Sequence, residues 1–129
     1  MFLSDRDNKT TRHQFRDQQM NCHEELTISI ISGKWKIDII YYLEMEGTLR
    51  FNEFRKKFPK LSHKVLTQQL RELETDGIVH RKVYTEIPPR VEYSLTPRGQ
   101  SLLPILRLIN EWGHDHLSYY VEKDKQTEQ

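Results

Sequence analysis

The side chains best suited to chemistry in this sequence fall on one face of a helix predicted within residues 61–77. Residues that recur every three or four positions share one side of an α-helix, and Lys64, Thr67, Gln68 and Arg71 share the polar side here. These side chains can donate hydrogen bonds to phosphate oxygens and to base edges in the major groove of DNA. The pattern predicts a nucleic-acid-reading helix, although a solvated amphipathic surface helix has the same appearance.

Sequence signals mark both ends of this helix, which we call the recognition helix. Ser62 can accept a hydrogen bond from a backbone N–H of the first turn, and Gly77 favours the left-handed conformation at which helices stop. The side of the helix opposite the polar one is predicted to face the core and consists of Val65, Leu66, Gln69, Leu70 and Leu73.

Basic residues are concentrated in the middle of the chain. The formal net charge is only +1, but within residues 47–98 basic side chains outnumber acidic ones, and the remainder of the chain is acidic. Local cations bind DNA by displacing its condensed counterions, so this distribution would direct the attraction to one surface. Charge alone is equally compatible with an ordinary solvated surface.

Three helices are predicted ahead of the recognition helix. Residues 24–32 are crowded with β-branched side chains, so their periodicity does not separate strand from helix, and we interpret them as a helix. A second helix is predicted between Gly33 and Gly47, and a third, shorter one covers residues 51–57. Only a short turn separates the third helix from the recognition helix, which predicts a helix-turn-helix.

After Gly77 the apolar pattern changes period, and apolar residues alternate with polar neighbours. Two alternating runs flank a rigid Pro88-Pro89 pair, which predicts a β-hairpin, the wing, over residues 79–95. The cationic residues of the wing are candidates for DNA contact, namely Arg81, Lys82 and Arg90.

Thr96 and Pro97 form an N-cap and first-turn pair that predicts a final helix from about residue 97 to 119. Its apolar side chains exceed one narrow stripe, which predicts that two chains associate through it. The residues predicted to form this dimer interface are Leu102, Leu106, Ile109 and Trp112.

The predicted fold class is mainly α with a small β-hairpin: a winged helix-turn-helix whose N- and C-terminal helices form a dimer interface. The chain of 129 residues suits one domain. We expect a polar N-terminal arm over residues 1–20, the winged helix-turn-helix domain over residues 21–117 and a flexible tail over residues 118–129.

The composition predicts a cytoplasmic protein. No run approaches the ~20 apolar residues that a membrane span requires, and the first residues lack the pattern of a secretory signal. Cys22 is the single cysteine, so no intrachain disulfide can form, as is typical of a reducing compartment.

Four ordered blocks of sequence carry a family resemblance, namely ISGKWK at 31–36, RFNEF at 50–54, LSHKVLTQQLRELETDGIV at 61–79 and PPRVEYSLTPRGQSL at 88–102. Together they resemble the HxlR-type branch of the bacterial winged helix-turn-helix transcription regulators, which are relatives of the MarR regulators. The resemblance covers about residues 22–116. It implies a homodimer with interlocked terminal helices that binds double-stranded DNA at a pseudo-palindromic operator.

The resemblance also implies which residues contact DNA. Arg90 matches the wing arginine of the family, and Lys34 and Arg50 match basic motif residues near the DNA-facing side, although a surface ion pair would explain each of these two equally well. Arg81 and Lys82 are wing candidates on their chemistry alone. The positions that match the family's recognition helix are Ser62, His63, Lys64, Thr67, Gln68 and Arg71.

Cys22 is a candidate redox sensor through the same resemblance, because some family members sense electrophiles or oxidants with a thiol at this place. Here the next residue is His23, where many members have proline. The alternative is a structural thiol that is inert because burial disfavours its charged form. A small-molecule or oxidant effector is therefore a possible partner.

Other classes of protein fit less well. We find no Gly-rich phosphate loop and no paired Cys ligands, and His114 and His116 would lie on different faces of a helix, so we expect no enzyme activity, no cofactor and no metal site. RNA is disfavoured because the deep, narrow major groove of an A-form duplex excludes a helix. The remaining alternative is a winged-helix protein-interaction module without a specific DNA site.

Overall fold

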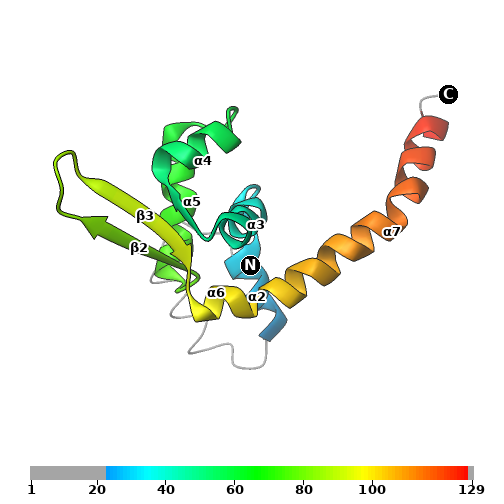
Figure 1. Cartoon of the computed structure of the whole chain (residues 1–129). Coiled ribbons are helices and arrows are strands. Elements are labelled where there is room, and N and C mark those ends of the chain that lie inside the picture. Colours follow the sequence, from blue (N-terminus) through cyan, green and yellow to red (C-terminus); the bar gives the residue numbers. More distant parts are fainter. Residues whose placement is uncertain (1–22, 128–129) are drawn as a thin grey trace.

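The structure, a computed structural model, describes residues 23–127 and is mainly helical with one small sheet (Figure 1). The polar arm predicted over residues 1–20 and Cys22 lie outside the described residues. In chain order the elements are α2 (His23–Ile31), α3 (Lys36–Glu46), β1 (Thr48–Arg50), α4 (Phe51–Lys57), α5 (His63–Thr75), β2 (Val79–Tyr84), β3 (Arg90–Leu95), α6 (Pro97–Ser101) and α7 (Leu103–Thr127). The helix-turn-helix and the hairpin expected from the sequence are both present, so the predicted winged helix-turn-helix fold, mainly α with a small β-hairpin, is confirmed.

Helix α5 is the predicted recognition helix, and local hydrogen bonds define both of its ends. The Ser62 hydroxyl accepts a hydrogen bond from the Val65 backbone N–H at 3.1 Å, as an N-cap does. At the other end Gly77 has a φ of 76°, and the next backbone N–H, of Ile78, donates to the Leu73 carbonyl at 2.9 Å. This left-handed turn satisfies the last carbonyls of the helix and directs the chain into β2.

The core lies between α3, α4, α5 and the inner face of the sheet. Helix α5 contributes three fully buried leucines, and the burial of each such side chain stabilises the fold by roughly 1.5–3 kcal/mol. Val65 and Gln69 were expected on the same face, but Val65 is 37% exposed and Gln69 is half-buried. The most deeply buried side chains of the core are Ile39, Ile40, Leu43, Phe54, Leu66, Leu70, Leu73, Ile78 and Leu106.

The sheet has three antiparallel strands in the order β1-β3-β2. Leu49, in the middle of β1, pairs with Tyr93 of β3, and both side chains are buried on the inner face of the sheet. We did not predict β1, because a strand of three residues between Gly47 and a helix is too short to show alternation. Through β1 the wing is joined to the start of α4.

The C-terminal helical region differs from its prediction in two ways. It is divided at Leu102, because Pro104 has no N–H to donate to the carbonyl four residues earlier. It also continues to Thr127 rather than ending near residue 119, so most of the segment predicted as a flexible tail is helical. Glu, Lys and Gln are frequent at its end, and these are good helix formers.

Figure 1 shows α7 extending away from the rest of the fold, on the side opposite the hairpin of β2 and β3. No helix in the described part of the chain is both long enough and apolar enough to cross a membrane.

Candidate nucleic-acid interface

The outward face of α5 presents the polar side chains that the sequence placed together. Lys64, Gln68 and Arg71 are exposed along it, and Thr67 is half-buried between them. The Thr67 hydroxyl donates to the backbone carbonyl of His63 at 2.8 Å, one turn back along the helix. Thr67 therefore presents mainly its methyl group, while Lys64 and Arg71 extend hydrogen-bond donors from this face and Gln68 donates to Glu72 Oε2 at 3.3 Å.

His63 connects the first turn of α5 to the start of α4. Its ring lies against the ring of Phe51, with 4.6 Å between the ring centroids. The sequence left open whether His63 faces phosphate or only solvent. In the structure its side chain is exposed and also packs on Phe51, so the two helices of the helix-turn-helix meet at this point.

A groove of 370 Å³ runs between α5 and the wing. Arg71 comes to this groove from α5 and Arg81 from β2, with the carboxylate of Glu74 also on its wall. The remaining lining residues are Phe51, His63, Thr67, Val91 and Tyr93. Two arginines on opposite walls of one groove are arranged to hold an anionic backbone that passes between helix and wing.

The strand register divides the wing cations between two faces of the sheet. Arg81 pairs with the buried Tyr93 and belongs to the inner face, toward α5, whereas Lys82 pairs with Glu92 on the outer face. The sequence placed both residues in one wing set. Because neighbouring residues of a strand point to opposite sides, only Arg81 shares the groove with α5.

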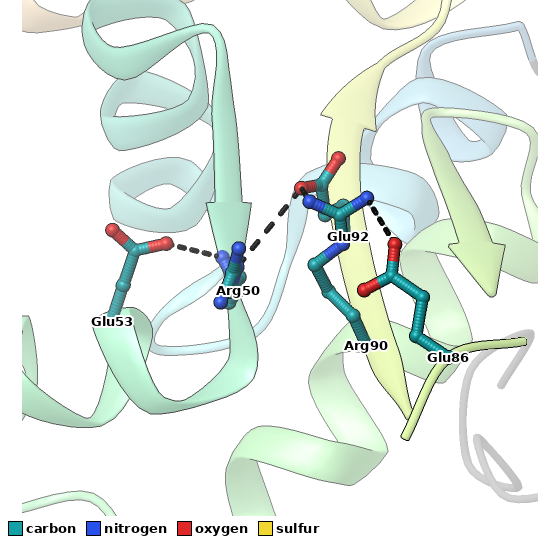
Figure 2. Close-up of polar contacts among 5 residues, drawn as sticks. All are labelled: Arg50, Glu53, Glu86, Arg90 and Glu92. Carbon is teal, nitrogen blue, oxygen red and sulfur yellow. Dashed lines mark hydrogen bonds and ion pairs between the residues drawn. The ribbon is translucent and has the colours of Figure 1, made fainter. Parts of the chain in front are cut away.

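Arg90 is held on the outer face of the sheet by two carboxylates (Figure 2). Its guanidinium contacts Glu86 at 3.1 Å and Glu92 at 3.5 Å, and it lies over the ring of Tyr84 with its Cζ 3.9 Å from the centroid. The sequence predicted a wing arginine directed at DNA. In the structure this arginine is engaged by two acidic side chains, so any DNA contact through it requires an exchange of partners.

Arg50 joins the same cluster from β1. Its Nε lies 4.0 Å from Glu92 Oε2, and its backbone N–H donates to Glu53 Oε1 at 2.8 Å, as Figure 2 shows. The Arg50 side chain remains 55% exposed. The surface ion pair that the sequence allowed for Arg50 is therefore present, and more than half of the side chain is still exposed.

Lys34 is exposed, and its ammonium group lies 5.1 Å from the centroid of the Trp35 ring, at the turn before α3. This is a cation–π contact, and no ion pair of Lys34 is found among the described residues.

Sequence reasoning missed Lys36, whose side chain is only 1% exposed and whose Nζ lies 2.5 Å from Glu72 Oε1 on α5. A signal for its burial was available, because Lys36 precedes Ile39, Ile40 and Leu43 at helical spacing and so shares their buried face.

The predicted dimer residues fall into two groups. Leu102 and Leu106 are buried in the core of their own chain, so they are not available to a second chain as the sequence suggested. Ile109 and Trp112 are 46% and 57% exposed on the projecting part of α7. The nearby apolar side chains that are also exposed there are Ile105, Leu108, Leu117, Tyr119, Tyr120 and Val121.

Two further features of residues 23–127 concern metal-ligating side chains and a shifted pKa. No group of three or more metal-ligating side chains is assembled there. Burial raises the pKa of Tyr41 above its ordinary value, and Glu44 adds to the effect, but Tyr41 is not among the residues predicted to bind DNA.

Comparisons with known proteins agree with this geometry. Residues 30–120 match the family model of the HxlR-like helix-turn-helix. An HTH-type transcriptional regulator of Bacillus subtilis strain 168, YdeP, is 49% identical over 100 residues, which cover 78% of this chain and 77% of that protein.

Two solved structures are similar in fold as well. The redox regulator HypR in its reduced form has a TM-score of 0.71 at 48% identity, covering 76% of this chain and 96% of that one. The diamide-treated YodB of B. subtilis has a TM-score of 0.65 at 34% identity, covering 76% of this chain and 96% of that one. The sequence resemblance is thereby confirmed, and this chain belongs to the HxlR-like helix-turn-helix family of transcriptional regulators.

Proposed function

We propose that this protein is a sequence-specific DNA-binding regulator of transcription that acts as a homodimer on a pseudo-palindromic operator. The observation that carries the proposal is the exposed row of Lys64, Gln68 and Arg71 on α5, beside a groove that Arg81 lines from the wing. In this arrangement α5 enters the major groove, and the adjoining strand of the DNA backbone passes between Arg71 and Arg81.

The contacts divide by role. Gln68 and Arg71 have the hydrogen-bonding groups that recognise base edges, whereas Lys64, Ser62 and His63 at the start of α5 are placed to meet phosphate. Arg50, Lys34 and Lys82 are further exposed cations outside the groove, and Arg90 would contribute after leaving its carboxylate partners.

Selection of bound sequences from random DNA, followed by binding measurements on the selected site, tests this function. Arg71→Ala or Gln68→Ala should relax the base preference at one position per half-site, because a good bidentate base contact is worth ~1–3 kcal/mol. Lys64→Ala should weaken binding to all sequences alike and reduce the salt slope by about 1.

Lys125→Ala, which removes the same charge from the last turn of α7, is the matched control and should leave binding unchanged. Wild-type binding in all three α5 variants would contradict the proposal and favour the alternative, a winged-helix module that binds another protein.

The homodimer rests on the exposed apolar side chains of α7, of which Ile109 and Trp112 are two. A second copy of the chain would cover this surface and place two α5 helices about 34 Å apart, one turn of DNA, for the usual half-site spacing.

We also propose that the protein responds to oxidants or electrophiles through the thiol of Cys22. This proposal is supported by the similarity to HypR, named a redox regulator, and to a YodB structure obtained after treatment with diamide. Cys22 immediately precedes α2, and the partial positive charge of a helix N-terminus favours a thiolate.

A further inference from the structure

Helix α7 leaves the body of the protein, which we define as residues 23–102, at Arg107 (Figure 1). Leu103 and Leu106 in its first turns are buried in the core. Arg107 follows Leu103 by one turn and so lies on the same side of the helix. Its Nη2 donates to Glu44 Oε1 on α3. The Arg107–Glu44 ion pair therefore continues the line of contacts that the two leucines begin.

Beyond Arg107 the described residues give α7 no further support from the body. Every side chain from residue 107 to 127 is exposed, and the hydrogen bonds and ring contacts of residues 108–127 join residues of α7 to one another. Asn110 and Glu111, one turn further along the side of Leu103 and Arg107, are exposed as well. Within the described part of the chain, Arg107 is thus the last side chain of α7 that is bonded to another element.

The partner of Arg107 is attached to a rigid part of α3. Glu44 follows Leu43, which is 1% exposed, and the Glu44 side chain itself is 31% exposed against 53% for Arg107. Both charges lie near the hydroxyl of Tyr41: burial raises the pKa of Tyr41, Glu44 adds to the effect and Arg107 opposes it. The ion pair therefore joins the base of the projecting helix to a segment that the core holds in place.

A small rotation at this point has a large effect on a dimer formed through α7. If the outer part of α7 is held by a second chain, rotation at Arg107 swings the body and α5 with it. An element about 15 Å from the pivot, the scale of a domain of about 100 residues, moves by about 4 Å when the body rotates by about 15°. One base pair of DNA rises by about 3.4 Å, so such a rotation corresponds to about one base pair of operator length.

We infer that Arg107 and Glu44 are positioning residues that set the spacing of operator half-sites accepted by the dimer; this inference rests on the proposed function. Rotation of the body to fit a longer or shorter operator breaks the ion pair in both chains. The two pairs thereby make the dimer selective for one spacing, while Leu103 and Leu106 keep α7 attached to the core.

Operators that differ only in the distance between their half-sites test the inference. The operator selected by the wild type is compared with versions that are one base pair longer or shorter. Glu44→Met/Arg107→Met should reduce the preference for the selected spacing by about 4- to 25-fold, because each exposed ion pair is worth about 2- to 5-fold and the dimer contains two. The base preference within each half-site should stay unchanged.

Reversed charges and a matched control separate this role from a general loss of charge. Glu44→Arg or Arg107→Glu alone should weaken the spacing preference, and Glu44→Arg/Arg107→Glu should recover most of it, because opposite charges then face each other again. Lys57→Met/Glu46→Met removes the ion pair between α4 and α3, at 3.2 Å, which does not involve α7, and should leave the preference unchanged. Urea unfolding of each full-length variant establishes that it is folded.

A distance between the two chains of the DNA-free dimer provides a readout that is independent of DNA binding. A spin label attached through Lys60→Cys, in a Cys22→Ser background, lies at the exposed turn before α5. Double electron–electron resonance should give a narrower distribution of distances between the two labels with the ion pair intact than in Glu44→Met/Arg107→Met. Distributions of equal width would overturn the inference.

The binding data separate failure of the inference from failure of the proposed function. A wild-type dimer that binds all three spacings equally overturns the inference alone, as does an unchanged preference in Glu44→Met/Arg107→Met or a reversed pair no more selective than its single variants. A Glu44→Met/Arg107→Met variant with the mass of a monomer also overturns it, because the pair would then belong to the dimer contact. A wild type that is monomeric or selects no sequence overturns the proposed function and the inference with it.

Discussion

At the scale of single residues, the partners of Arg90 differ in how easily they can be exchanged for phosphate. Glu92 lies in the central strand, is 21% exposed and also approaches Arg50. Glu86 belongs to the loop between β2 and β3 and is 53% exposed. An approaching phosphate would therefore displace Glu86 first, while Glu92 keeps Arg90 in place over Tyr84.

Glu86→Gln should consequently increase DNA affinity by up to ~5-fold at low salt, because an exposed ion pair contributes ~0.2–1 kcal/mol that phosphate would otherwise have to replace. Binding titrations over a range of salt concentrations measure the effect. Removal of any negative charge favours DNA to some degree, so the decisive comparison is Glu86→Gln in an Arg90→Met background. An equal gain in both backgrounds would mean that Glu86 does not compete for Arg90.

Cys22 is the other residue whose chemistry can be tested alone. Oxidation could produce a sulfenic acid, a mixed disulfide or a Cys22–Cys22 bridge between chains, each of which would alter the spacing of the two α5 helices. Diamide, a quinone and peroxide should reduce operator binding by the wild type and not by Cys22→Ser, with non-reducing gels to detect a bridge. Equal loss in both proteins, or no response in either, would make Cys22 a structural thiol.

At the scale of elements, the base of the wing is fastened to α5 and α6 through Thr96. Its hydroxyl donates to the Gly77 carbonyl at 2.5 Å and accepts from the Gly99 N–H at 3.0 Å, and its backbone N–H donates to the Ile78 carbonyl at 3.0 Å. These bonds hold the end of α5, the start of β2 and the start of α6 together. The position of the wing relative to α5 therefore depends on this junction.

Gly99→Ala should damage that junction, because a Cβ at residue 99 would lie 2.3 Å from the Ile78 carbonyl oxygen, a backbone atom that cannot move aside easily. We expect a loss of roughly 1–3 kcal/mol in the free energy of unfolding, as for other overpacked sites, measured by urea denaturation. Gly113→Ala is the matched control, since a Cβ there meets nothing within 4 Å. If the two variants proved equally stable, the close packing of α6 on Ile78 would be refuted.

At the scale of the whole molecule, the two parts of α7 have different structural roles. Its first turns complete the core through Leu103 and Leu106, whereas the part beyond Ile109 is exposed and rich in apolar side chains. In Figure 1 this outer part of α7 projects away from the other labelled helices and strands. We expect it to contact a second chain, because apolar patches of this kind usually mark an interface.

Truncation after residue 111 should therefore produce a folded monomer that has lost operator affinity, because Leu103 and Leu106 are retained while Trp112 and the later apolar residues are removed. A chain that ends at Val121 lacks only the polar end of α7 and is the control that should remain dimeric. Light scattering at micromolar concentration measures the mass. A wild type with the mass of a monomer would contradict the proposed assembly.

Local patterns in the sequence were sufficient to predict the elements that carry the candidate site. The N-cap Ser62, the stop at Gly77 and the alternation on both sides of Pro88 and Pro89 depend on residues only a few positions apart. The same periodicity separated the exposed row on α5 from its buried leucines. These features follow from helix and strand geometry, which adjacent residues determine.

Only the tertiary structure decided which distant side chains meet. The pairing of β1 with β3 joins Arg50 to Glu92, the strand register separates Arg81 from Lys82, and Lys36 reaches Glu72 across two packed helices. Leu102 and Leu106 likewise pack into the core of their own chain rather than remaining available to a partner. Charge and hydrophobicity read along a sequence give the type of each side chain but not its neighbour, because long-range contacts depend on how the elements pack together.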